Sequence, residues 1–326
     1  MALSLAYPQG QYGMPMITAL AGGVGAARLL TGLAHVVAPE QISAIVNTGD
    51  DMVLHGLHIS PDIDTLTYSL AGAGNSHTGW GLAGETWHVM DALERYGGET
   101  WFRLGDRDLA THLYRTQRLR TGATLTQVTS EIARSWAVST RLLPMSDDPV
   151  RTQITLASGE QVEFQHYFVR LRHDVAVSDV RFTGATEARP TPQALQALNE
   201  AETVIICPSN PVVSIGPILA VPSYASVLAN RRESVVAVSP IVAGAAIKGP
   251  ADHMMAELGH EPSVVGVARL YARLAATLLI DESDAALAGQ VEACGMRCVV
   301  APAVMSSPAL AAGLASRALE AVRSPV

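Results

Sequence analysis

The chain has 326 residues, of which 48% are hydrophobic and only 5% aromatic, so its core must consist mainly of aliphatic side chains, as in helix-covered parallel sheets. The formal net charge of −8 at pH 7 excludes the basic face that nucleic-acid binding requires. Three cysteines in a chain of this length form neither a disulfide framework nor a four-ligand metal site, and they fit a reducing cytoplasm.

The first 16 residues lack a basic start and a continuous apolar stretch, so we interpret residues 1–16 as an N-terminal tail and not as a signal peptide. No run in the sequence approaches the ~18 consecutive apolar residues of a membrane-spanning helix. We therefore expect a cytoplasmic protein that binds neither a membrane nor nucleic acid.

The order strand, glycine turn, helix, strand opens the folded part of the chain. A short apolar run at residues 16–20 precedes the turn at 22–25, apolar side chains at helical spacing follow at 26–37, and a second apolar run occupies 42–46. This order begins a doubly wound sheet, in which ligands bind at the carboxyl ends of the strands.

The glycine turn has two interpretations. Gly22, Gly23 and Gly25 can bring backbone N–H groups to a phosphate at the start of a helix, or they can only permit close packing of the helix on its strand. The turn has neither the full G-x-G-x-x-G pattern of a dinucleotide site nor the lysine of a P-loop. Walker-type ATP hydrolysis is therefore not expected.

Two pairs of aspartates follow the second strand. Asp50 and Asp51 come directly after an Asn-Thr-Gly turn, and Asp62 and Asp64 follow an apolar loop at residues 52–59. Carboxylates in this arrangement hold a divalent cation or bind a hydroxyl, whereas Asp62 or Asp64 can also only cap the next helix. An apolar segment framed by carboxylates favours a folded cleft over a surface loop, so we take all four as candidate metal ligands.

We interpret residues 66–190 as an insertion of helices and a small antiparallel sheet into a Rossmann-like core formed by 17–65 and 191–326. Alternating polar and apolar residues at 153–156 and 161–164 predict a hairpin. Apolar spacing predicts helices at 85–96, 108–120 and 125–136.

One predicted helix of this insertion begins with an arginine between two carboxylates. Arg107 stands between Asp106 and Asp108, and His112 follows about one turn later. In the functional interpretation, Arg107 binds a phosphate or a planar heterocycle and His112 faces the same side. In the structural interpretation, Asp106 caps the helix, Arg107 forms a surface ion pair and His112 is a packed side chain.

The α/β pattern returns in the last third of the chain. Ser209, Asn210 and Ser214 follow one predicted strand, and Ser239 ends the next; at strand ends they can contact a nucleobase, ribose or phosphate, or they can only terminate the strands. The pattern predicts strands at 203–207, 235–238, 264–267 and 278–280, and helices at 268–278 and 308–322.

Six motifs stand in a fixed order: Gly22-Gly23-x-Gly25, Asn47-Thr48-Gly49-Asp50-Asp51, Pro61-Asp62-Ile63-Asp64-Thr65, Leu104-Gly105-Asp106-Arg107-Asp108-x-Ala110-Thr111-His112, Leu143-Pro144-Met145-Ser146-Asp147-Asp148 and Pro208-Ser209-Asn210-Pro211-x-x-Ser214-Ile215-Gly216-Pro217. They resemble the motifs of the 2-phospho-L-lactate transferase family of coenzyme F420 biosynthesis, including its bacterial phosphoenolpyruvate-transferring members. The resemblance runs from about Ile17 to the C-terminus.

The resemblance implies an α/β fold, a Rossmann-like, mostly parallel sheet with helices on both faces and an inserted smaller domain, in an Mg²⁺-dependent enzyme that is often dimeric. It also implies a reaction. The ribityl hydroxyl of the deazaflavin Fo attacks the diphosphate of a guanosine-linked lactyl or enolpyruvyl donor, GMP leaves, and a phosphodiester is formed.

By the same resemblance, the four aspartates are candidates for contacts to the metal and the Fo hydroxyl. Mg²⁺ held by Asp50 and a partner carboxylate would neutralise charge on the leaving phosphate, and Asp62 or Asp64 would orient the hydroxyl and accept its proton. Asp50 and Asp64 are therefore the predicted catalytic residues. The predicted substrate-binding residues are Gly22, Gly23, Gly25, Asp62, Arg107, His112, Ser209, Asn210, Ser214 and Ser239.

Two other functions compete with this one. An NAD(P)-dependent oxidoreductase would use the glycine turn and place Asp50 on a ribose, but it leaves Asp62 and Asp64 without a role. A non-catalytic, nucleotide-sensing regulator would not need the motif at 104–108. Within the transferase interpretation we expect small-molecule substrates and a homodimer, and the lactyl and enolpyruvyl donors both stay open.

Overall fold

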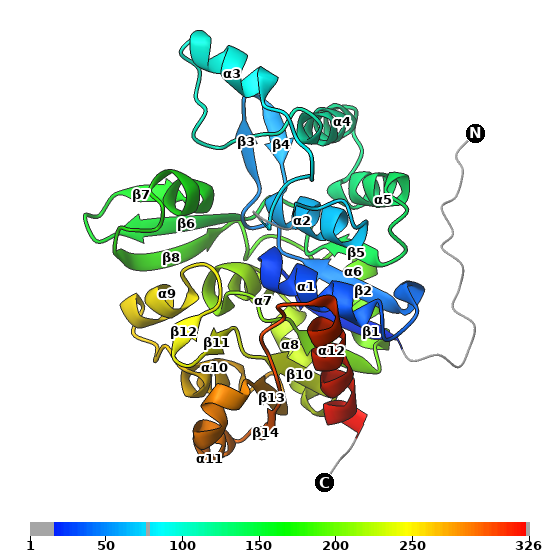
Figure 1. The fold of residues 1–326 in the computed structure, drawn as a ribbon, viewed down its shortest axis with the longest axis vertical. Helices are drawn as coiled ribbons and strands as arrows, with labels where there is room; N and C mark the ends of the chain where they lie inside the picture. The colour runs from blue at the N-terminus through cyan, green and yellow to red at the C-terminus, as the bar shows by residue number, and fades with distance from the viewer. Residues whose placement is uncertain (1–15, 76–78, 324–326) are drawn as a thin grey trace.

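A computed structural model describes residues 16–75 and 79–323 of the protein, so the predicted tail at 1–16 lies outside the described residues except for Met16. The centre is a seven-stranded sheet of order β14-β13-β10-β9-β1-β2-β5, in which every neighbouring pair is parallel (Figure 1). Its strands are β1 (Ile17–Ala21), β2 (Ile42–Val46), β5 (Arg141–Pro144), β9 (Thr203–Ile206), β10 (Val235–Val238), β13 (Thr277–Ile280) and β14 (Arg297–Val300).

Helices cover both faces of this sheet, because alternate side chains of each strand point to opposite sides. In β1, Ile17, Ala19 and Ala21 belong to one core cluster and Leu20 to the other. The first cluster includes side chains of α1, α2, α5 and α12, and the second includes those of α6, α8 and α10. The α-helices are α1 (Gly23–Leu33), α2 (Pro61–Leu70), α3 (His88–Arg95), α4 (Asp108–Arg120), α5 (Leu125–Ser135), α6 (Pro192–Glu200), α7 (Gly216–Ala220), α8 (Tyr224–Asn230), α9 (Ala251–Glu257), α10 (Val264–Tyr271), α11 (Ala288–Ala293) and α12 (Pro308–Arg323).

Smaller antiparallel units project from the central sheet (Figure 1). The strands β6 (Arg151–Leu156), β7 (Gln161–Glu163) and β8 (Val177–Thr183) form a three-stranded sheet in the order β7-β6-β8. The strands β3 (Met52–Leu54) and β4 (Leu57–Ile59) form a hairpin that packs near α3 and α4. The third antiparallel unit is the pair β11 (Ile241–Val242) and β12 (Ala245–Ala246).

The predicted fold class is confirmed: a mostly parallel sheet lies between two layers of helices, with small antiparallel sheets beside it. The predicted hairpin is the pair β6–β7, which is antiparallel. The strand β5 lies inside the range 66–190 that we assigned to an insertion. It belongs to the central sheet nevertheless, because it pairs with β2 at the sheet edge.

One predicted strand is wrong. Residues 264–267 begin helix α10, which ends at Tyr271, so the predicted helix at 268–278 starts too late and ends too late. The Ser263 side chain caps α10 by accepting bonds from the N–H groups of Val265 and Gly266, each at 3.2 Å. A short run of apolar residues does not by itself distinguish a buried strand from a buried helix, and here the cap decides.

Among the described residues, no single helix is long and apolar enough to cross a membrane. One bent pair, formed by Pro211–Ala220 and Tyr224–Asn230 with an angle of 93° between them, passes the same test on length and composition alone.

The packing of α1 on α12 depends on Gly32. A Cβ at Gly32 would overlap the backbone carbonyl of Ala311, which cannot move away as a side-chain end could. We therefore expect Gly32→Ala to lower the free energy of unfolding by about 1–3 kcal/mol, since overpacking outweighs the better helix propensity of alanine. Urea unfolding followed by circular dichroism measures the change.

Gly313, in the middle of α12, is the matched control. A Cβ there meets nothing within 4 Å, so Gly313→Ala should raise the free energy of unfolding by about 0.5–1 kcal/mol. Equal effects of the two substitutions would contradict the proposed close approach of the helices.

Candidate functional site

Three neighbouring strands end at one place. The chain leaves β1 at Gly22, β2 at Asn47 and β9 just before Ser209, and the sheet order places these strands side by side as β9-β1-β2. After β1, the chain adds β2 and β5 on one side of β1. It later adds β9, β10, β13 and β14 on the other side. The strand order therefore reverses between the paired strands β1 and β9, and their carboxyl ends form the topological switch point, where open α/β sheets bind ligands.

The glycine turn is shaped by its close neighbours. A Cβ at Gly22 would lie 2.7 Å from the Asp62 carboxylate and 2.9 Å from the Ser214 Cβ, and one at Gly25 would overlap the carbonyl oxygen of Pro208. Gly23 has a φ of +70°, in the left-handed region that glycine tolerates. Glycine at these positions therefore allows the loops after the other strands to approach the N-terminus of α1.

Asp62 fills the space left beside Gly22. Its Oδ1 accepts a hydrogen bond from the Gly23 N–H at 2.8 Å, and its Oδ2 accepts one from the Asn47 side-chain amide at 2.9 Å. Burial raises the pKa of Asp62 to about 6, although these two bonds favour its charged form. The nearby negative charge of Asp51 adds to the increase in pKa.

Asp50 and Asp51 are buried, at 6% and 3% exposure. In each, Oδ1 is buried without a hydrogen-bond partner among the described residues. Burial raises the pKa of Asp50 well above its usual range, and the charges of Asp62 and Asp51 raise it further. An orphaned carboxylate oxygen beside further negative charge fits a divalent cation such as Mg²⁺, which needs only one or two protein carboxylates and would supply both the missing partner and the missing positive charge.

Asp51 and Asp64 have defined partners as well. The Nε2 atom of His58 lies 2.9 Å from Oδ2 of Asp51, and the Ser60 hydroxyl donates to the same oxygen at 2.8 Å. Both oxygens of Asp64 accept bonds from the guanidinium of Arg115, one of them at 3.1 Å. Asp64 therefore faces α4, and its oxygens are already committed within the protein.

His112 lies beside Asp64 and not on the protein surface. Its Nδ1 is 3.2 Å from Nη1 of Arg115, and its Nε2 is 3.2 Å from Oδ2 of Asp108. Ligand atoms of Asp64, Asp108 and His112 all lie within 4.8 Å of one another, as in a metal centre. The guanidinium of Arg115 already provides a cation on both Asp64 oxygens, whereas Asp50, Asp51 and Asp62 do not form such a three-ligand group among the described residues.

The predicted serine and asparagine contacts fall into two groups. Ser209 binds the glycine turn, because its hydroxyl donates to the Gly22 carbonyl at 2.7 Å, and Ser214 packs against Gly22. Asn210 accepts bonds from the N–H groups of residues 212 and 213, as a helix cap does. Ser239 bonds to both backbone groups of Ile241, so its hydroxyl closes a local turn at the end of β10.

Arg107 lies apart from the four aspartates, at the exposed start of α4. Its Nη1 donates to the Ala83 carbonyl at 3.0 Å and its N–H donates to Glu85 at 2.9 Å. Asp106 caps α3 and not the helix that follows it, since its carboxylate accepts the N–H groups of His88 and Val89. Arg107 therefore holds the segment that leads into a small neighbouring pocket.

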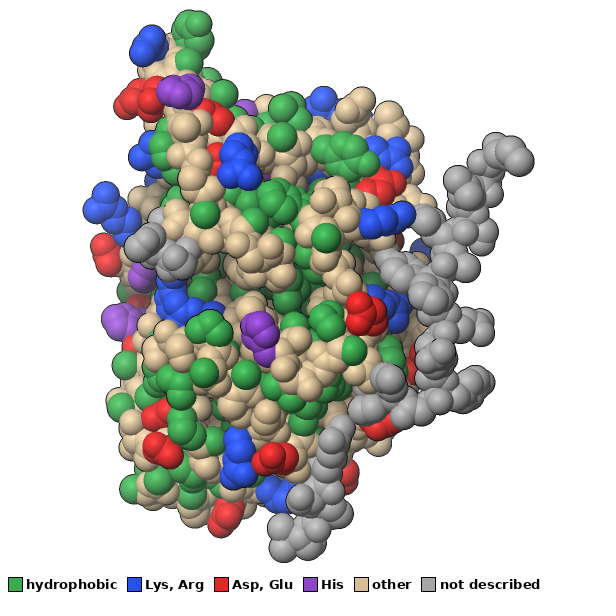
Figure 2. Space-filling view, turned by 45° about the vertical axis from the view of Figure 1, so that its right-hand side comes forward, with side chains coloured by type: hydrophobic (Ala, Val, Ile, Leu, Met, Phe, Trp, Pro, Cys, Tyr) green, Lys and Arg blue, Asp and Glu red, His purple; other side chains and the backbone are tan. Residues whose placement is uncertain are grey.

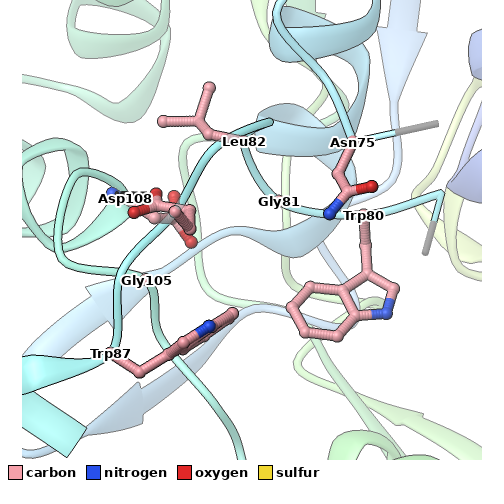
Figure 3. Close-up of a pocket in the computed structure, with 8 residues that line it drawn as sticks. Asn75, Trp80, Gly81, Leu82, Trp87, Gly105 and Asp108 are labelled. Carbon is pink, nitrogen blue, oxygen red and sulfur yellow. Dashed lines mark hydrogen bonds between the residues drawn. The ribbon is translucent and has the colours of Figure 1, made fainter. Parts of the chain in front are cut away.

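That pocket has an aromatic wall and an acidic one. Figure 3 shows Trp80 and Trp87 on one side and Asp108 on another, and the two indole rings are 6.4 Å apart in an edge arrangement. The Asp108 carboxylate accepts a hydrogen bond from the Tyr68 hydroxyl at 2.6 Å. The pocket is lined by Asn75, Trp80, Gly81, Leu82, Glu85, Trp87, Gly105 and Asp108.

On the face shown in Figure 2, basic side chains are scattered among acidic ones around a largely apolar and polar centre. This arrangement agrees with the net charge of −8. On this face, charge of one sign does not gather into a patch.

Three residues of the site, Arg115, His58 and Asn47, were not among those predicted from the sequence. Arg115 follows His112 by three positions on a predicted helix, so a shared helix face was the available signal. Asn47 directly follows a strand, as ligand contacts in such sheets do. His58 lies in a loop that carried no helical or strand pattern, and only the pairing of β3 with β4 places it against Asp51.

The fold and this centre define an α/β protein whose switch point is suited to a phosphate and a divalent cation. The sequence profile of the family described as 2-phospho-L-lactate transferase CofD matches residues 17–296. The chain therefore belongs to that family and is a transferase, as the six motifs predicted.

Similar proteins cover nearly the whole chain. A phosphoenolpyruvate transferase of Streptomyces griseus is 44% identical over 309 residues, which are 93% of this chain and 97% of that protein. One of Mycobacterium tuberculosis is 40% identical over 284 residues, which are 81% and 86% of the two chains. A solved UPF0052-family structure from Bacillus halodurans has the same fold, with a TM-score of 0.59 at 16% identity, and it covers 94% of this chain and 100% of its own.

The raised pKa of Asp62 predicts a pH dependence of stability in the metal-free protein. Because the pKa is about 6 in the folded state against an ordinary 3.8, protonation favours folding, and this contribution is lost as the pH rises through about 6. In the unmodified protein, ionisation of Asp62 should lower the unfolding free energy by about 2–3 kcal/mol between about pH 4 and pH 7. Asp62→Asn should remove this decrease. Urea unfolding in EDTA measures it.

Asp91→Asn, on the exposed surface of α3, is the control for removing a carboxylate. It should keep the pH dependence of the unmodified protein. If Asp62→Asn keeps it as well, the assigned burial cost of Asp62 is incorrect.

Proposed function

We propose that this protein transfers a phosphoenolpyruvyl or phospholactyl group from a guanosine-diphosphate-linked donor to the ribityl hydroxyl of the deazaflavin Fo, with release of GMP, in coenzyme F420 biosynthesis. The observation that supports this most is the contact of Asp62 with the glycine turn at the switch point of the sheet, with the charges of Asp50 and Asp51 close to Asp62. Diphosphate chemistry requires both backbone donors and a cation, and both fit here.

The donor would bind at the β1–β9 side of the site. The glycine turn opens α1, whose N-terminus carries partial positive charge that suits phosphate oxygens, while the N–H groups of Gly22 and Gly23 bond to Ser209 and Asp62. Ser209 and Asn210 stabilise this wall, since Ser209 bonds to Gly22 and Asn210 caps the segment containing Ser214. These side chains keep the turn in a fixed shape, so phosphate binding needs little reorganisation.

Mg²⁺ is the cation that we propose, held by Asp50 with Asp62, beside Asp51, and by water and the donor phosphates, since Mg²⁺ usually takes only one or two protein carboxylates. When bound, the ion would neutralise the negative charge that develops on the leaving phosphate. The chain contributes the carboxylates and keeps them dry, because all three are nine-tenths buried or more.

The acceptor hydroxyl would be activated by a carboxylate of the same group. Asp50 is engaged by the ion, but Asp51 has a buried Oδ1 without a hydrogen-bond partner among the described residues, so it is suited to orient a hydroxyl and to accept its proton, an effect of about 10²–10⁴-fold. Both oxygens of Asp64 bond to Arg115, so Asp64 would act by holding its neighbours in place.

The cavity beside Trp80 and Trp87 has a volume of about 20 Å³, enough for about one water molecule, so the deazaflavin ring of the acceptor would lie against the exposed face of Trp80 and not inside the cavity. Trp80 and Trp87 offer flat apolar surfaces, and Asp108 offers an acceptor for a ring N–H or O–H. Asp108 contacts His112, which contacts Arg115, and Arg115 bonds to Asp64. The same contacts would therefore hold the residues near the ring and those near the hydroxyl. Arg107 would act here indirectly, through its bonds to the segment at 83–85.

The relatives named phosphoenolpyruvate transferase favour the enolpyruvyl donor over the lactyl one. Transferase family membership replaces the oxidoreductase and the non-catalytic regulator that the sequence left open. A homodimer and a cytoplasmic location stay expectations from the sequence resemblance.

Incubation of the purified protein with Fo, Mg²⁺ and each candidate donor tests the proposal. Mass spectrometry should detect an Fo phosphodiester and GMP, with more product from the enolpyruvyl donor. The lactyl product is heavier by two hydrogens, so one spectrum distinguishes the donors. Absence of both products, with Fo and donor recovered unchanged, would refute the function.

Substitution of Asp50 tests the mechanism. Asp50→Asn keeps the shape but removes the charge, so kcat should fall by roughly 10²–10³-fold while the protein stays folded. Burial makes the ionised Asp50 carboxylate unfavourable for folding. In the absence of metal, the variant should therefore be at least as stable as the unmodified protein. Steady-state kinetics and thermal unfolding measure the two effects.

Asp179→Asn, in the outlying sheet β7-β6-β8, is the matched control, since Asp179 pairs only with Arg181 on its own strand. It should leave kcat unchanged. Turnover by Asp50→Asn within about threefold of the control would remove Asp50 from the catalytic group.

A further inference from the structure

We propose that Arg115 is a positioning residue that holds in place the two acidic loops of the proposed cation site, the one with Asp50 and Asp51 and the one with Asp62, a role that rests on the proposed function. Arg115 is 0% exposed, and it is the one buried arginine or lysine in the part of the chain that the structure describes. It comes from α4, outside the glycine turn and both aspartate loops, and it contacts the supports of each loop.

The first branch leads from Arg115 to Asp51. Its Nη1 donates to the backbone carbonyl of His58 at 3.4 Å, and the next residue, Thr116, accepts the N–H of His58 at 2.7 Å. Helix α4 therefore holds both backbone groups of His58. The imidazole of His58 in turn bonds to Asp51, the neighbour of Asp50, so α4 supports the loop that follows β2.

The second branch leads from Arg115 to Asp62. Both Asp64 oxygens accept bonds from its guanidinium, which anchors the first turn of α2. Asp62 lies in the same turn and reaches the N–H of Gly23. One side chain thereby supports the carboxylates that come from the two separate loops.

The planar fork of a guanidinium explains why arginine occupies this position. One nitrogen faces Asp64, the His58 carbonyl and Nδ1 of His112 together, while the other faces the second Asp64 oxygen. An ammonium has a different donor geometry and cannot satisfy both Asp64 oxygens in one plane. Lysine would keep the positive charge and lose the geometry, which separates positioning from simple charge balance.

The experiment compares Arg115→Lys with Arg118→Lys, its matched control. Arg118 lies on the same helix and forms the same two-nitrogen contact with a carboxylate, that of Glu131, at 2.9 and 2.8 Å, away from the site. Binding of Mn²⁺ to the purified protein without substrates is measured by electron paramagnetic resonance, together with thermal unfolding, kcat and the KM for Mg²⁺ and donor.

We expect Arg115→Lys to weaken Mn²⁺ binding by roughly tenfold or more, raise the KM for Mg²⁺ by a similar factor and lower kcat. The KM for the donor, bound on the glycine turn, should change less. Arg118→Lys should match the unmodified protein in every measurement. Mn²⁺ binding by Arg115→Lys within about threefold of the control overturns the proposal, as does an unmodified protein that binds no Mn²⁺.

If Arg115→Lys does not fold, a second variant keeps the test decisive. Arg115→Gln combined with Asp64→Asn replaces the buried ion pair by a neutral hydrogen-bonding pair, so no unpaired charge is left inside. It should bind Mn²⁺ as weakly as predicted for Arg115→Lys, and normal binding would overturn the proposal. Failure of the proposed function is recognised separately, by an unmodified protein that binds Mn²⁺ but forms no Fo phosphodiester.

Discussion

The Asp62 carboxylate occupies the space where a side chain at Gly22 would lie, and the rest of the site depends on that contact. Through it, the first turn of α2 reaches the first turn of α1, and the N–H of Gly23 binds the carboxylate directly. Helix N-termini carry partial positive charge, which helps to hold a buried negative group between them. Any larger residue at position 22 would separate the phosphate-suited turn from the carboxylates, and the chemistry requires both.

The site also concentrates negative charge inside the protein. Asp50, Asp51 and Asp62 repel one another in a buried environment, which raises the pKa of Asp50 and Asp62. Such a group is unfavourable for folding without a cation, and natural proteins keep unfavourable groups of this kind at functional centres. A positive guanidinium on one side and an incoming divalent ion on the other would balance the charge without filling the space that a substrate needs.

Different chemical groups lie on the two sides of the switch point, as the sheet order dictates. The loops after β1 and β9 provide backbone groups and hydroxyls, whereas the loop after β2 and the start of α2 provide carboxylates. The aromatic pocket lies beyond the carboxylates and is connected to them by Asp108 and His112.

The sequence by itself determined the sheet, the glycine turn, the hairpin β6–β7 and the clustering of aspartates after a strand, because aliphatic runs, glycine spacing and alternation are local patterns. It did not decide 264–267, where the Ser263 cap favours a helix, nor the direction in which each aspartate faces. Only the tertiary structure decided that Asp62 meets Gly23 and that Asp64 meets Arg115, 51 positions away in the chain. Such pairings depend on how α2 and α4 pack, and packing between distant segments leaves no local pattern in the sequence.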